Sequence, residues 1–166
     1  PLYSSAASDV YKRQDITVAG HATGTAGVIS LTGSSTFKQR VGDAKNFGPT
    51  TSNTDWSFVN LTFSNSDTSA HTITTQSCSN CDVAVSGSLT IGEGSDQATT
   101  TLAAGDKTWT LSGTGTSVLV FNASSILQGD TSTFKYTGNN NTTVTAVDTG
   151  TGYYYNLQIL PGAASK

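Results

Sequence analysis

The stretch DVAVSGSLTIGEG, residues 82–94, decides the fold. Apolar side chains alternate with small or polar ones at Val83, Val85, Leu89 and Ile91. This period of two is the pattern of a β-strand that has one buried and one solvated face. Two such strands joined by a bare Ser-Gly turn are spaced too closely for most Greek-key sandwiches. The stretch therefore predicts the short stacked strands of a β-solenoid.

Similar short runs, separated by Gly, Asn, Asp and Ser, follow one another from Asp15 to Leu160, and none has helical spacing. Gly occurs 17 times and charged residues make up only 11%, which suits strands and turns better than helices. Intrinsic disorder is the alternative, but 35% hydrophobic residues with six Phe, six Tyr and two Trp argue against it. The expected inward positions are Val83, Val85, Leu89, Ile91, Leu102, Trp109, Leu111, Val118, Val120, Phe134, Val144, Leu157 and Ile159.

The chain also contains an internal recurrence. STFK at residues 35–38 recurs at 132–135, and FVNLTF at 58–63 recurs as YYNLQI at 154–159, at offsets of 97 and 96 residues. Such self-similarity in a β-rich chain is typical of a stacked array. We predict one β-solenoid segment over residues 15–160, with the end of one copy at 15–63, a full copy at 64–159 and a tail at 161–166. An antiparallel β-sandwich, Ig-like or jelly roll, is the alternative.

Four motifs carry a resemblance to a known family: VAVSGSLTIGEG, GDKTWTLSG, STFKYTG with TTVTAV, and YYYNLQI. Together they resemble the repeats of large bacterial cell-surface β-solenoid proteins known mainly from metagenomes, and the YYNL closure is the most specific part. The first copy departs from the pattern, because FKQR at residues 37–40 runs into a long polar stretch without YTG. The resemblance implies a right-handed parallel β-helix without known catalysis, stacked on neighbouring repeats of the same chain.

Residues 1–14, PLYSSAASDVYKRQ, differ in character from the rest of the chain. They show no strand alternation, and SSAASDVYKRQ resembles a translated sequencing-adapter segment. We therefore predict a non-native or disordered leader, with an ordinary N-terminal linker as the alternative. Because the chain starts at Pro1 with neither an initiator Met nor a signal segment, we also expect a fragment or a processed form.

Charge and hydropathy narrow the choice of partners. The net charge is −3 and the cations form no patch, so we expect no nucleic-acid partner. No apolar run approaches the length of a membrane span, so we expect no membrane insertion in this segment.

Cys78-Ser-Asn-Cys81 is the one motif with sharp chemical meaning. A zinc site would need four ligands, and only His21 and His71 remain to supply the others. A redox pair would sit at a helix N-terminus, and no helical pattern follows. We therefore favour a local disulfide that closes a loop tip in an oxidising compartment, which agrees with an extracellular or cell-surface location.

Two further sets of residues are candidates for specific roles. Asn60 and Asn156 could form an Asn ladder, in which a side-chain amide bonds the backbone of the neighbouring coil; a left-handed turn conformation is the alternative reading. Trp56, Tyr153 and Tyr154 could form a flat stacking surface for glycans, although alternation turns about half of the aromatic residues inward.

The acidic residues are scattered, and we expect most of them to cap turns. Glycoside chemistry needs two carboxyls that face one bond, but the sequence has no DxD-type pair and no acid-rich coil, and no EF-hand loop, P-loop, GxSxG or HExxH motif is present. We expect no enzyme activity, no catalytic residue, no cofactor and no metal. The leading hypothesis is a structural or adhesive segment of a secreted repeat protein. The alternatives are a carbohydrate-binding module and a fragment of a β-helix polysaccharide lyase or hydrolase.

Overall fold

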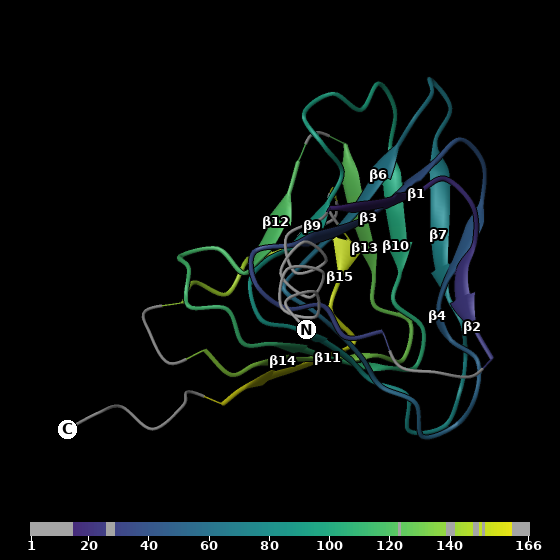
Figure 1. Ribbon diagram of the computed structural model, residues 1–166. Coiled ribbons are helices and arrows are strands. Elements are labelled where there is room, and N and C mark those ends of the chain that lie inside the picture. Colours follow the sequence, from purple (N-terminus) through teal and green to yellow (C-terminus); the bar gives the residue numbers. More distant parts are fainter. Residues whose placement is uncertain are drawn as a thin grey trace, which may run out of the picture.

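The computed structural model describes residues 15–25, 29–122, 124–138, 142–147, 150 and 152–160. These residues form strands and turns and contain no helix. The predicted leader at 1–14 and the predicted tail at 161–166 lie outside the described residues. Figure 1 shows three groups of strands that surround a common interior, with the chain passing from one group to the next.

Three parallel sheets make up the fold. Sheet A contains β1 (Ile16–Val18), β3 (Thr36–Val41), β6 (Asn60–Asn65), β9 (Leu89–Ile91) and β12 (Leu119–Phe121). Sheet B contains β2 (Ala22–Gly24), β4 (Lys45–Pro49), β7 (His71–Thr75), β10 (Thr100–Ala103), β13 (Ser125–Gln128) and β15 (Gly152–Tyr153). Sheet C contains β5 (Trp56–Phe58), β8 (Val83–Val85), β11 (Thr108–Leu111), β14 (Thr133–Tyr136) and β16 (Asn156–Ile159).

The chain visits the sheets in the order A, B, C and then returns to sheet A one layer further on, so that each circuit is one coil. Every strand pair is parallel, as in Leu61 opposite Leu89 and Trp109 opposite Phe134. The prediction of a parallel β-solenoid is confirmed, with about five coils. The antiparallel sandwich alternative is wrong, because a sandwich needs neighbouring strands that run in opposite directions.

Inward side chains of successive coils stand above one another in columns. In sheet C the column runs Trp56, Val83, Trp109, Phe134 and Leu157. The members of this column from Trp56 to Phe134 are buried, so each coil covers the apolar side of the next. Most of the predicted inward positions are buried, namely Val83, Val85, Leu89, Ile91, Leu102, Trp109, Leu111, Val118 and Phe134.

Not every expected inward position is buried near the C-terminal end. Val120 is only half-buried because Leu119, the partner of Leu89, takes the inward position in β12. Leu157 and Ile159 are 42% and 59% exposed, because β16 is the last strand of sheet C and no described coil covers it. Val144 is partly buried and packs against the core.

The recurring sequence pieces form the same strand pair twice. Thr36-Phe37 lies opposite Asn60-Leu61 in sheet A, and Thr133-Phe134 lies opposite Asn156-Leu157 in sheet C. The two-strand unit is therefore repeated in the same register but on a different sheet. The expected boundary between residues 63 and 64 falls inside β6, and a longer array with a period of about 97 residues stays a prediction.

Candidate functional site

Asn60 begins β6, and its side chain links three successive coils. Its Nδ2 donates to the carbonyl of Ser35 in the preceding coil at 3.4 Å. Its Oδ1 accepts the backbone N–H of Ser88 at 3.1 Å and the Ser88 hydroxyl at 3.2 Å in the following coil. Gly87 is needed beside it, because a Cβ there would lie 2.5 Å from this Oδ1 and 2.8 Å from the carbonyl of Val59. Asn60 thus has the contacts that an Asn ladder requires.

Asn156 occupies the equivalent place at the start of β16. Its backbone N–H donates to the carbonyl of Ser132 at 3.1 Å, just as the N–H of Asn60 donates to Ser35 at 3.2 Å. Its side chain, however, is exposed, and no described coil follows β16. The ladder role of Asn156 therefore stays a prediction for a chain in which another coil covers it.

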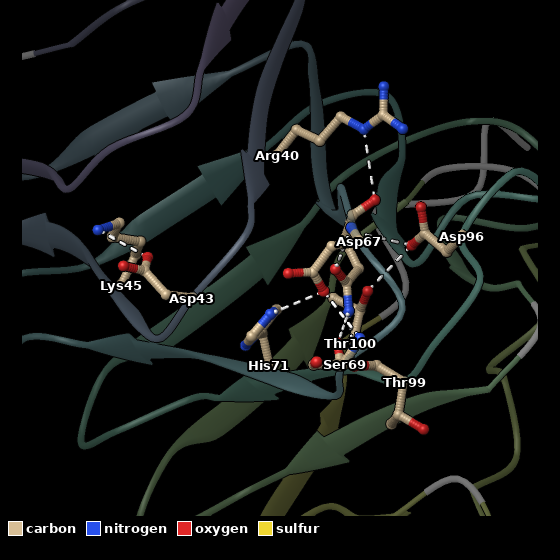
Figure 2. Close-up of polar contacts among 10 residues, drawn as sticks. Arg40, Asp43, Lys45, Asp67, Ser69, His71, Asp96, Thr99 and Thr100 are labelled. Carbon is tan, nitrogen blue, oxygen red and sulfur yellow. Dashed lines mark hydrogen bonds and ion pairs between the residues drawn. The ribbon is translucent and has the colours of Figure 1, made fainter.

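A polar cluster fills the turn from sheet A to sheet B, and Figure 2 shows it around Asp67 and Asp96. We call Asn65, Asp67, Ser69, His71 and Asp96 the A–B corner. Asn65 is buried at its centre, and its backbone N–H donates to Asp96 Oδ2 at 3.0 Å. Its Nδ2 donates to the carbonyl of Ser69 at 2.5 Å, and its Oδ1 accepts the N–H of Asp67 at 3.0 Å.

The pair His71 and Asp67 is the most catalysis-like feature of this corner. His71 Nε2 lies 2.9 Å from Asp67 Oδ1, which also accepts the N–H of Ser69 at 2.8 Å. The Ser69 N–H and then the His71 ring lower the pKa of the Asp67 carboxyl. Asp67 Oδ1 thus joins the His71 ring and the Ser69 backbone, so the pair orders this turn. Sequence analysis missed this corner, although the NSD run at residues 65–67 is typical of a side-chain-capped turn.

The two cysteines lie in the turn from sheet B to sheet C. Cys78 and Cys81 are joined by a disulfide, with Cα atoms 5.7 Å apart. Buried Lys107, one coil further on, donates from Nζ to Cys78 Sγ at 3.1 Å. Burial lowers the pKa of the Lys107 ammonium, and the charges of Asp106 and Asp82 act in the opposite direction.

Neither histidine joins the cysteines. His71 contacts Asp67 in the A–B corner, and His21 Nδ1 accepts the N–H of Asn46 at 3.0 Å. Within the part of the chain that the structure describes, no group of three His, Cys, Asp or Glu side chains is placed to hold a metal ion.

The expected glycan surface does not form as predicted. Trp56 is only 2% exposed and packs edge-on against Phe47 with ring centroids 5.6 Å apart, so its assignment to a stacking surface is wrong. Alternation within β5 places it inward. Tyr154 is half-buried, and its hydroxyl lies 2.7 Å from that of Tyr136. Tyr153 is 48% exposed and remains available to solvent.

Several acidic residues bond the backbone of a neighbouring coil, as the turn-capping prediction requires. Asp55 accepts the N–H of Asp82 at 2.9 Å, and Asp82 in turn accepts the N–H of Thr108 at 3.0 Å. Asp130 accepts the N–H of Gly105 at 3.0 Å. These carboxylates form a capping series along the stack, so their role in the structure is to hold successive coils together.

A shallow polar cavity of about 290 Å³ lies on the outer face of sheet A. It is lined by Asp15, Thr17, Thr36, Lys38, Thr62 and Glu93. Its charged groups are already engaged: Lys38 pairs with Glu93 at 2.6 Å, and Asp15 accepts the N–H of Thr36 at 2.8 Å.

Comparison of the chain with protein-family models, with curated proteins and with solved structures finds no match in any of the three. None of the described residues belongs to a helix that could cross a membrane. The class of protein that the structure itself defines is a three-sided parallel β-solenoid.

Proposed function

We propose that this chain is a structural or adhesive segment of a secreted or cell-surface repeat protein, without catalysis of its own. In this role the stacked coils set a length and present polar outer faces. The bacterial surface proteins whose repeats the sequence resembles are the model for such a segment. The parallel β-solenoid supports the repeat-protein part of the proposal.

The observation that carries the proposal is the use of polar side chains to hold one coil to the next. Asn60 spans three coils, and the Asp55 and Asp82 carboxylates each cap the backbone of the following coil. Asn60 and Asp82 are half-buried, and half-buried polar groups engaged with backbone rigidify a structure, because each would be costly to leave unpaired; Asp55 is exposed and adds a weaker link. A spacer needs this kind of rigidity between coils.

Surface location is tested by labelling intact cells. An antibody raised against this chain should label unpermeabilised cells of the source organism, or detect the protein in the culture medium. Labelling that appears only after permeabilisation would contradict the proposal. A periplasmic or cytoplasmic control antigen must remain unlabelled in the same intact cells.

Carbohydrate binding is the second candidate, and one observation favours it: Tyr153 and Tyr155 are 48% and 59% exposed near the last coil. A glycan array distinguishes the two functions. A purely structural segment should show no signal that the double variant Tyr153→Ala, Tyr155→Ala removes. Aromatic-dependent binding would favour a carbohydrate-binding module. Degradation of pectin or alginate that one Asp→Asn substitution abolishes would instead support a polysaccharide lyase or hydrolase.

A further inference from the structure

A buried cation lies against the disulfide in the middle of the stack. Lys107, in the turn from sheet B to sheet C of the next coil, is only 2% exposed, and its Nζ donates to Cys78 Sγ at 3.1 Å. Asp106 and Asp82 are the carboxylates that act on its ammonium, but within the described ranges Lys107 forms an ion pair with neither. A buried ammonium without a counter-charge is costly. While the disulfide is intact, a neutral sulfur occupies the place of that counter-charge.

The fold fixes Lys107 at this place from both sides of the stack. Its carbonyl accepts the N–H of Thr133 in the following coil at 3.0 Å, and the N–H of the next residue, Thr108, donates to Asp82 in the preceding coil at 3.0 Å. Gly48 makes room for the aliphatic stem, because a Cβ there would lie 3.3 Å from Lys107 Cε. The ammonium is therefore held beside Cys78.

The two sulfurs of the disulfide have different surroundings. Cys81 is 1% exposed, and its Sγ lies 3.1 Å from the carbonyl oxygen of Thr51, an acceptor that favours a protonated thiol. Cys78 is half-buried beside the exposed tip of the turn, so a small thiol can reach its sulfur. The Pro49 carbonyl at 3.0 Å opposes ionisation of Cys78, but the full charge of Lys107 at a similar distance outweighs that dipole. On reduction, Cys78 is thus the sulfur that ionises, and Cys81 stays a thiol.

We propose that Cys78 and Cys81 are a reversible thiol–disulfide exchange site for small thiols, in which the Lys107 ammonium stabilises the Cys78 thiolate that reduction releases. The thiolate of one reductant molecule attacks Cys78 Sγ and forms a mixed disulfide, while Cys81 leaves and takes a proton from solvent. A second reductant thiolate attacks the reductant sulfur of this mixed disulfide, so that Cys78 leaves as a thiolate. Two thiols are thereby oxidised to one disulfide, and the protein disulfide accepts the two electrons. This inference goes beyond the proposed structural role and does not rest on it.

The pH dependence of alkylation tests the proposal in the unmodified chain. The protein is reduced with dithiothreitol, freed of reductant and treated with iodoacetamide from about pH 5 to pH 10, and tandem mass spectrometry measures the rate at each cysteine. The midpoint of the rate against pH reports the thiolate fraction and does not depend on accessibility. We expect the Cys78 midpoint to lie about one pH unit or more below the ordinary thiol pKa of about 8.5, and to return to that value in urea.

Lys107→Met keeps the length of the side chain and removes its charge. Lys135→Met, on the outward face of sheet C, removes the same charge at a distance and is the matched control. We expect Lys107→Met to raise the Cys78 midpoint by about one pH unit and the control to leave it unchanged. In a mixture of reduced and oxidised glutathione, the unmodified chain should interconvert between disulfide, Cys78–glutathione adduct and dithiol while its circular dichroism stays that of the folded protein.

Three results would overturn the proposal: a Cys78 midpoint at the ordinary thiol value, an equal midpoint in Lys107→Met, or reduction by glutathione that occurs only with unfolding. If Lys107→Met does not fold, the comparison of the folded with the urea-unfolded unmodified chain decides.

Discussion

Two Ala substitutions, at Asn60 and at the equivalent Asn156, show how much the side-chain contacts of the Asn ladder contribute to stability beyond the strand pairing that both residues share. Both residues begin an Asn-Leu strand, and in both the backbone N–H donates to a Ser carbonyl of the preceding coil. Among the described residues, only Asn60 has a following coil, where its Oδ1 accepts the Ser88 N–H and hydroxyl. We therefore expect Asn60→Ala to destabilise the protein and Asn156→Ala to be nearly neutral.

The size of the effect follows from the groups that lose a partner. Without the Asn60 amide, the half-buried Ser88 N–H loses its acceptor, and an unsatisfied group of this kind costs about 1–3 kcal/mol. The Nδ2 contact to Ser35 is long at 3.4 Å and adds little. Because water can partly reach the site, we expect Asn60→Ala to lower the free energy of unfolding by about 1–2 kcal/mol. For a chain of this size, this loss corresponds to a fall of roughly 3–6 °C in melting temperature. Asn156→Ala should stay within about 0.5 kcal/mol.

Urea unfolding at low protein concentration, followed by tryptophan fluorescence, measures both variants. Trp56 and Trp109 are buried and report the loss of the core. Asn60→Asp is the matched control, because a carboxylate keeps the acceptor for Ser88, and it should recover at least half of the loss. Equal losses for Asn60→Ala and Asn156→Ala would refute the reasoning, as would a loss for Asn60→Asp equal to that for Asn60→Ala.

Three further predictions follow from single residues. Trp109→Ala should cost about 4 kcal/mol in urea unfolding followed by circular dichroism, because its buried ring stacks between two aromatic rings, and Trp109→Phe should cost less than half as much. Gly113→Ala should cost about 1–3 kcal/mol in the same measurement, since a Cβ there would lie 2.1 Å from a carbonyl oxygen of the neighbouring coil, whereas Gly94→Ala meets nothing within 4 Å and should be neutral. The pKa of Asp67 is lowered in the folded state, chiefly by the Ser69 N–H, so the ionised carboxylate stabilises the fold fully above the ordinary aspartate pKa of about 3.9, and this stabilisation is lost as pH falls through the lower folded pKa. Asp67→Asn should therefore reduce the loss of unfolding free energy measured below about pH 4. An unchanged pH dependence of stability below about pH 4 would contradict this.

The alternating strands of the second half were predictable because their inward residues are aliphatic or aromatic at strict spacing. Val83, Val85, Leu89 and Ile91 needed only the period of two. The core residues of the first half are harder to recognise in the sequence. Phe47 is fully buried in a strand that also contains Gly48 and Pro49, so that no alternation marks it.

The candidate site was less predictable than the fold. The contacts of Asn60 depend on which coil lies above it, and that is a matter of register between residues 28 positions apart, from Asn60 to Ser88. Trp56 was mistaken for a surface residue because the sequence shows that it alternates but not which of the two faces is inside. Similarly, the sequence does not show that Lys107 lies beside Cys78, because the two residues meet only when the turns from sheet B to sheet C of successive coils stack.

The change of sheet between the two Thr-Phe and Asn-Leu strand pairs has a consequence for any longer array. The path from β3 to β14 comprises three full coils and two further strands, so the second pair is turned about the axis by one sheet relative to the first. If the recurrence continued, successive copies would display a given outward patch toward three directions in rotation, and the fourth copy would point the same way as the first. A filament built in this manner would present the same outward patch along a spiral, so that a partner could bind it from any side.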